Sequence, residues 1–259
     1  MTTISMSAQV APPVLQGART SAVETHKHKD FQRLARLTGL MFLITYATSI
    51  PPVFAFYVPA LKDPAFILGG GFDMSVSWGA ILELLLILSN LATAIALYPV
   101  LKRRFPVLSL SFIGARIAES TFIAIGIIAV LALNTMRMQG AADEASLAVV
   151  GQALVALHDW TFNLGPGVVV GVGNGLILGY MMWKTRLVPR AMSILGLIGG
   201  PALLVAGAAV ILGLIQAGST PQIIATIPEF FWELSLGLWL LVRGFSPKAL
   251  AELDARQAG

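Results

Sequence analysis

The sequence predicts an all-α fold, a polytopic membrane helix bundle of six transmembrane helices plus a short interfacial helix. Of the 259 residues, 56% are hydrophobic and only 12% are charged, whereas soluble domains carry about 25% charged residues. The mean hydropathy is +0.81, and several apolar runs reach the ~20 residues that cross a bilayer. The basic residues gather in short segments between these runs, as is typical of multi-pass membrane proteins.

The chain is expected to divide into three parts. Residues 1–33 have no apolar segment typical of a signal peptide, and they are expected to form a disordered cytoplasmic tail. Residues 34–243 are expected to form the six-helix transmembrane domain, and residues 244–259 a second cytoplasmic tail. The absence of cysteine excludes disulfides, thiolate catalysis and cysteine-ligated metals.

The first three spans are predicted from long apolar runs. In the first run, Pro51 and Pro52 remove backbone donors, which predicts a kink or an early end of the helix. The third run is interrupted by Arg116 and Glu119, whose spacing places both side chains on one helix face. The predicted spans are residues 34–57, 75–101 and 107–134.

Residues 145–160 admit two interpretations, a seventh crossing or a helix lying in the interface. With six spans, 14 of the 17 basic residues fall on the side of the N-terminus, and only Lys62 and Arg137 fall in the opposite loops. A seventh crossing would weaken this bias, so the sequence favours the interfacial helix and places both termini in the cytoplasm. The last three spans are then predicted at residues 164–183, 189–214 and 223–242.

Glycines recur every four residues in the fourth predicted span, at Gly167, Gly171, Gly175 and Gly179. Such a stripe lets the backbone of another helix approach closely. The fifth predicted span has its own pair of small residues, Gly196 and Gly200, so we expect these two helices to pack on each other.

Four short stretches point to a known family. They are the residues Arg116–Glu119, Leu157–Asp159, Pro189–Gly196 and Glu233–Leu241. Over residues 31–245 the chain resembles the bacterial membrane family called domain of unknown function 4386. The resemblance implies a six-span protein of the bacterial cytoplasmic (inner) membrane, and it implies no activity, substrate or cofactor.

Ionisable residues inside apolar runs are the candidates for a functional site, because such residues are costly in hydrocarbon and mark binding or transport sites. Counting residues along the predicted helices places five of these residues at overlapping depths in the membrane. We therefore expect one polar pocket that opens outward, formed by Glu83, Arg116, Glu119, His158 and Glu233. In it, three glutamates would face one arginine, and the excess carboxylates would have to be protonated, hydrated or bound to a cation.

Two classes of function remain open at this point. The pocket could bind or transport a small solute, an ion or a proton, or the buried charges could only stabilise the bundle of a structural or regulatory protein. An intramembrane enzyme acting on lipid would need His158 close to Glu119 or Glu233. The sequence contains no catalytic triad, Walker loop or HExxH motif. It therefore predicts no catalytic residues, metal, cofactor or nucleic-acid partner, it implies the lipid bilayer as a partner, and it leaves the oligomeric state open.

Overall fold

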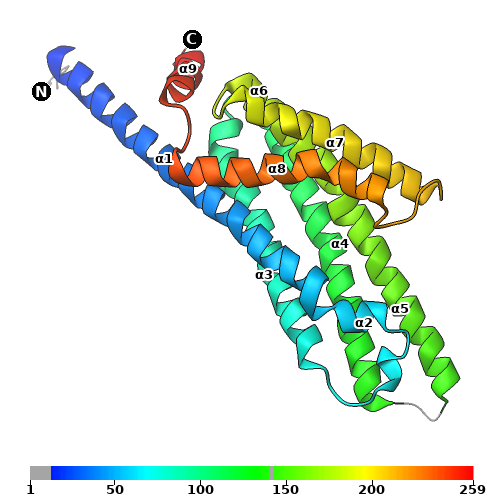
Figure 1. Ribbon diagram of the computed structural model, residues 1–259. Helices are drawn as coiled ribbons and strands as arrows, with labels where there is room; N and C mark the ends of the chain where they lie inside the picture. Colours follow the sequence, from blue (N-terminus) through cyan, green and yellow to red (C-terminus); the bar gives the residue numbers. More distant parts are fainter. Residues whose placement is uncertain (1–12, 141–142, 259) are drawn as a thin grey trace, which may run out of the picture.

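The computed structural model describes residues 13–140 and 143–258, with side chains from His28 to Arg256. All regular structure in this described part is helical, which confirms the predicted all-α bundle (Figure 1). Six helices in the described residues are long and apolar enough to cross a membrane. The α-helices are α1 (Pro13–Pro51), α2 (Val58–Lys62), α3 (Met74–Leu101), α4 (Pro106–Gln139), α5 (Glu144–Leu164), α6 (Gly179–Thr185), α7 (Arg190–Ile211), α8 (Thr220–Val242) and α9 (Pro247–Ala258).

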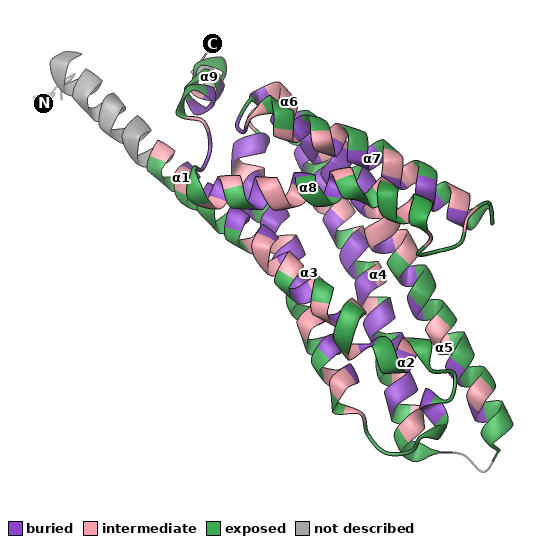
Figure 2. Ribbon diagram, viewed as in Figure 1, coloured by how far each residue is buried: buried purple, intermediate pink, exposed green. Residues whose placement is uncertain are grey.

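The long helices form a connected bundle. Helix α3 packs against both α1 and α4, and α5 runs along the other side of α4. Helices α7 and α8 lie side by side and run across the others (Figure 1). Buried and exposed residues alternate along the long helices (Figure 2), and the exposed ones include large apolar residues such as Leu88, Ile128 and Val205. An apolar outer surface of this kind fits a lipid environment.

The first helix begins earlier than the sequence predicts. Helix α1 starts at Pro13 and not near Leu34, so the expected disordered tail is helical from Pro13 onward, and residues 1–12 lie outside the described part. Proline fits the first turn of a helix because its missing N–H needs no partner there. At Pro51–Pro52 the α-helix ends as predicted, and the chain continues as one π-helical segment, Pro52–Phe56.

The expected interfacial helix at residues 145–160 is part of the fourth span. Helix α5 runs without a break through two π-helical segments, Gly165–Val169 and Gly171–Leu178, into α6. The result is one helix of 42 residues, Glu144–Thr185. Gly165 and Pro166 begin the first of the two π-helical segments. The wider π turn accommodates the proline ring, whose missing N–H would interrupt the hydrogen bonding of a regular α-helix.

The C-terminal segment is also folded in the structure. Phe245, Leu250 and Leu253 are buried, and they belong to one apolar core with Phe31 of α1 and Leu187. At one end of the molecule, this core connects α1 near Phe31 with helix α9 and with the loop between α6 and α7 (Figure 1). The expected C-terminal tail therefore contains the helix α9, which packs on the bundle.

The glycine stripe lies where the sequence predicts it, between the fourth span and α7. A Cβ added at Gly171 would lie 2.8 Å from the carbonyl oxygen of Gly200, and one at Gly179 would lie 3.4 Å from the nitrogen of Leu197. Side chains at these positions would push the two backbones apart. The predicted helix–helix contact is confirmed, and it holds the π-helical segment against α7.

Candidate functional site

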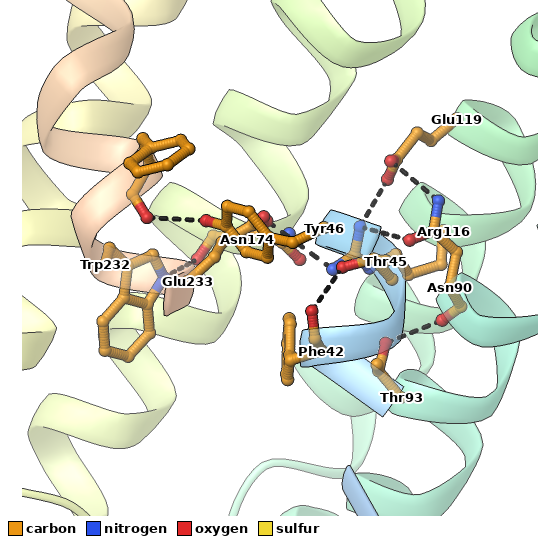
Figure 3. Close-up of polar contacts among 11 residues, drawn as sticks. Phe42, Thr45, Tyr46, Asn90, Thr93, Arg116, Glu119, Asn174, Trp232 and Glu233 are labelled. Atoms are coloured by element: carbon orange, nitrogen blue, oxygen red, sulfur yellow. Dashed lines mark hydrogen bonds and ion pairs between the residues drawn. The ribbon is translucent and has the colours of Figure 1, made fainter. Parts of the chain in front are cut away.

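Arg116 lies at the centre of a closed set of polar contacts between α3 and α4 (Figure 3). Its Nη1 donates a hydrogen bond of 2.7 Å to Glu119 Oε2 and one of 3.3 Å to Asn90 Oδ1. Asn90 Nδ2 in turn donates to Glu119 Oε1 at 2.9 Å. The rings of Phe42 and Phe112 lie 5.6 Å and 5.7 Å from the guanidinium carbon, within the range of cation–π contacts. The predicted pair Arg116–Glu119 is therefore formed, and α1, α3 and α4 all enclose it.

Helix α8 brings a second carboxylate to the same arginine. Glu233 Oε1 lies 3.6 Å from Arg116 Nη2. Glu229 precedes Glu233 by one turn of α8 and is 2% exposed, so the two carboxyl groups lie on the same face of this helix. We call Arg116, Glu119, Glu229 and Glu233 the carboxylate cluster. In it, Glu119 and Glu233 contact the guanidinium directly, and Glu229 lies one helical turn from Glu233.

Several buried polar atoms at and near the carboxylate cluster have no hydrogen-bond partner among the described residues. Neither carboxyl oxygen of Glu229 accepts a hydrogen bond there, and neither does Glu233 Oε1. Asn174 is fully buried, and its side-chain oxygen and nitrogen are likewise unpaired within the described part. Its backbone carbonyl accepts a 3.0 Å hydrogen bond from the indole of Trp232 (Figure 3). Buried polar atoms are nearly always paired, so this concentration marks the carboxylate cluster as the candidate site.

Glycines make the space for Glu229. A Cβ added at Gly199 of α7 would lie 2.6 Å from Glu229 Oε2, and one at Gly175 would lie 2.8 Å from the same atom. Gly175 and Asn174 belong to the π-helical segment Gly171–Leu178. Short π-helical segments occur frequently at functional sites. The carboxyl group of Glu229 thus lies directly in the contact between α7 and this segment.

The other two predicted site residues lie elsewhere. The hydroxyl of Tyr57 donates a 2.9 Å hydrogen bond to Glu83 Oε2, and the Tyr57 ring meets the His158 ring edge to face with centroids 5.6 Å apart. His158 Nδ1 lies 3.7 Å from Asp159 Oδ1. We call Tyr57, Glu83 and His158 the tyrosine group. Glu83 precedes Asn90 by seven residues of α3, which is about two turns or roughly 10 Å.

The five residues that the sequence placed in one pocket are therefore divided between two groups. Arg116, Glu119 and Glu233 share direct contacts, whereas Glu83 and His158 have separate partners. His158 contacts Tyr57 and Asp159, and among the described residues it has no hydrogen bond or ion pair with Glu119 or Glu233.

Sequence reasoning did not include Glu229, Asn174 or Tyr57 in the site. The spacing Glu229–Glu233 was the available signal for Glu229, because residues four apart share a helix face. No such signal exists for Tyr57, which lies outside the predicted pocket in sequence and reaches Glu83 through the fold.

A comparison with known families agrees with this architecture. The sequence profile of the family described as "Domain of unknown function (DUF4386)" matches residues 37–244. The chain belongs to this family. The matched region contains both the carboxylate cluster and the tyrosine group, and it leaves out the first part of α1 and helix α9. No curated protein matches the chain, and no solved structure does.

Membership in this family fits a multi-pass membrane protein and assigns no chemistry. Among the side chains that the structure describes, in residues 28–140 and 143–256, no three His, Asp or Glu residues come together in a way that could hold a metal ion. The carboxylate cluster instead places carboxyl groups around one guanidinium.

Proposed function

We propose that this membrane protein binds a proton in the carboxylate cluster and couples its binding and release to the movement of a small solute or ion across the membrane. The observation that carries the proposal is Glu229. Its side chain is 2% exposed, and neither of its oxygens accepts a hydrogen bond within the described part of the chain. An ionised carboxylate in such surroundings costs far more free energy than a protonated one.

The charge of the cluster supports the same reading. One guanidinium balances one carboxylate, and Arg116 already has a close, hydrogen-bonded partner in Glu119. Two further carboxylates on α8 would leave the cluster with two uncompensated negative charges if all three were ionised. A proton bound at Glu229 or shared between Glu229 and Glu233 removes part of that excess.

A purely structural role accounts for less of the arrangement. The triangle of Arg116, Glu119 and Asn90 is complete in itself and would be enough to join α3 to α4. Glu229 and Glu233 add buried charge, and replacing them by apolar residues would serve packing better. Helices that move relative to one another as the cluster gains and loses a proton would give these two residues a use.

We also infer that the protein lies in a bacterial inner membrane with both termini in the cytoplasm. The support is that basic segments far apart in sequence meet at one end of the molecule. Arg104 Nη1 donates to the carbonyl of Lys184, and Asp254 of α9 pairs with both His28 of α1 and Arg103. Basic residues concentrate on the cytoplasmic side of bacterial membrane proteins.

Infrared spectroscopy of the purified protein tests proton binding. A protonated carboxyl group in an apolar site has a C=O stretch that is separate from the carboxylate bands, and we expect this band in the wild type at neutral pH. Glu229→Gln should remove it, and Glu144→Gln, a change at an exposed residue at the start of α5, should leave it unchanged. A wild-type protein without the band would overturn the proposal and favour the structural role.

A further inference from the structure

The tyrosine group lies beside an open pocket at the α2 end of the molecule. The pocket, of about 270 Å³, is formed by residues 60–67 and α5, and its polar lining includes Lys62, Asp63, Gln152 and Asp159. This volume has room for several water molecules. Its apolar wall includes Ala60, Phe66, Ile67 and Leu133, which belong to the same apolar core as Tyr57.

Asp159 connects this pocket to the buried histidine. Its carboxylate lines the pocket and is 59% exposed, yet one of its oxygens lies 3.7 Å from His158 Nδ1. His158 is 5% exposed, and its Nδ1 has no hydrogen-bond partner among the described residues. A water molecule in the pocket is therefore separated from a buried, unpaired imidazole nitrogen by one side chain.

The residues around His158 suit the exchange of a proton. Tyr57, from the turn before α2, and Asp159 of α5 both contact the imidazole directly. Glu83 of α3 accepts the hydrogen bond from the Tyr57 hydroxyl. Helix α4 faces His158 with Gly126, which carries no side chain. Towards the pocket end of α4, the first titratable residue is Arg137, and it donates a hydrogen bond to the carbonyl of Phe66 on the pocket wall. Histidine and hydroxyl groups in series are the side chains that pass protons most readily.

An apolar layer separates the tyrosine group from the carboxylate cluster. Leu86 and Ile87 lie on α3 between Glu83 and Asn90, and they pack against Ile123 of α4, which lies one turn beyond Glu119. The hydroxyl of Ser89 on α3 is bonded to the carbonyl of Leu85. The buried hydroxyl of Ser120, next to Glu119 on α4, has no hydrogen-bond partner among the described residues and lies on the cluster side of the layer. The apolar side chains of the layer itself exclude water and so block proton transfer until the helices shift.

The opposite approach to the cluster is poorly suited to water. Glu233 is 17% exposed at its side chain, but α8 carries the exposed rings of Phe230 and Phe231 on the neighbouring surface. Tyr46 of α1 closes on α8 there, with its hydroxyl bonded to the carbonyl of Phe230. Exposed aromatic and aliphatic side chains on a membrane-spanning helix face hydrocarbon.

We propose that Tyr57, Glu83 and His158 form a second proton-binding site, through which the carboxylate cluster exchanges protons with the pocket, and that Leu86, Ile87 and Ile123 are the barrier between the two sites. This inference rests on the proposed function. A proton from pocket water binds His158 and converts the imidazole to imidazolium, which the carboxylates of Glu83 and Asp159 stabilise. When the barrier becomes hydrated, that proton passes to a carboxylate of the cluster and the imidazole returns to its neutral form.

Exchange into heavy water tests the barrier at two probes. The first is the carboxyl band of Glu229, whose shift reports replacement of its proton by deuterium, and the second is the indole N–H of Trp232, which is fully buried at the cluster. Ile123→Thr places a hydroxyl group in the barrier and should speed exchange at both probes about tenfold, equivalent to about 1.4 kcal/mol of barrier. The matched control is Ile128→Thr on the same helix, where the side chain is 66% exposed, and it should change neither rate.

Tyr57→Phe tests the second site itself, because it removes one oxygen and keeps the ring. We expect it to slow exchange of the Glu229 carboxyl about tenfold. Leu86→Ala serves as a second barrier variant if Ile123→Thr does not fold, and it should also speed exchange. If the carboxyl band is absent but Ile123→Thr speeds exchange of the Trp232 indole, the proposed function fails and the barrier stands. If the band is present and neither barrier variant changes either rate, or Tyr57→Phe leaves carboxyl exchange unchanged, this second proposal is overturned.

Discussion

Removing the charge of Arg116 is the most direct perturbation of the cluster. Arg116→Met keeps much of the side-chain volume between Phe42 and Phe112, but it leaves three buried carboxyl groups without a cation. Breaking a buried ion pair by removing one partner costs about 3–5 kcal/mol. In a chain of this size, 1 kcal/mol corresponds to roughly 2–4 °C in melting temperature. We therefore expect a decrease on the order of 10 °C, measured by thermal unfolding in detergent.

A double-mutant cycle separates charge from packing. Glu119→Gln keeps an oxygen that can accept from Asn90 Nδ2 but removes one negative charge. Arg116→Met with Glu119→Gln should recover about half or more of the lost stability, because the two residues are directly coupled. Arg33→Ala is the control, since its pair with Asp30 has the same spacing but is exposed, and it should cost less than about 1 kcal/mol. If the double variant is no more stable than Arg116→Met alone, the uncompensated carboxylates are not the cause and the electrostatic account of the cluster is wrong.

Three further outcomes are expected. Gly175→Leu should reduce folded yield sharply, since its Cβ would meet Gly200 and Glu229, whereas Gly167→Leu, where the nearest atom would be 3.7 Å away, should be tolerated; equal losses would contradict the packing account. Reporter fusions at Arg137 and Lys248 should report opposite compartments, and matching signals would refute the topology. Hydrogen bonds from the Ser146 hydroxyl and the Ala145 N–H lower the pKa of Asp143. The ionised Asp143 therefore stabilises the first turn of α5 above the ordinary aspartate pKa, and this stabilisation is lost as the pH falls through the lowered pKa. Amide hydrogen exchange in that turn should show the loss, and Asp143→Asn should remove its pH dependence.

The sequence predicted those features that depend on one helix or on two complementary patterns. The Arg116–Glu119 pair follows from a spacing of three residues within α4, and it is formed as expected. The contact between the glycine stripe and α7 follows from matching small residues on both helices. The charge bias correctly limited the chain to six long apolar helices, although it did not show that residues 145–160 continue directly into the fourth span.

Features that depend on how helices are placed side by side could not be read from the sequence. Counting residues along the predicted spans placed Glu83 and Glu233 at similar depths in the membrane, but depth does not determine which neighbouring helix each side chain faces. Helix α3 aligns with α4 so that Asn90, and not Glu83, meets Glu119. Helix α8 crosses the bundle at an angle (Figure 1). Its Glu233 reaches Arg116 with Glu229 one turn away, whereas Glu83 is bonded to Tyr57. The rotation of α8 also buries Trp232, which donates its indole N–H to Asn174.

The glycine contact and the carboxylate cluster are parts of a single arrangement. Helices of a membrane protein gain little from apolar burial against one another, so close packing of small residues has to supply the contact energy. At Gly175 and Gly199 that close packing stops at the carboxyl group of Glu229, because both glycines face its Oε2 atom. Any change in the charge or hydration of Glu229 must therefore alter the space between the π-helical segment and α7. This is a physical route by which a proton on one side chain could move two of the spans relative to each other.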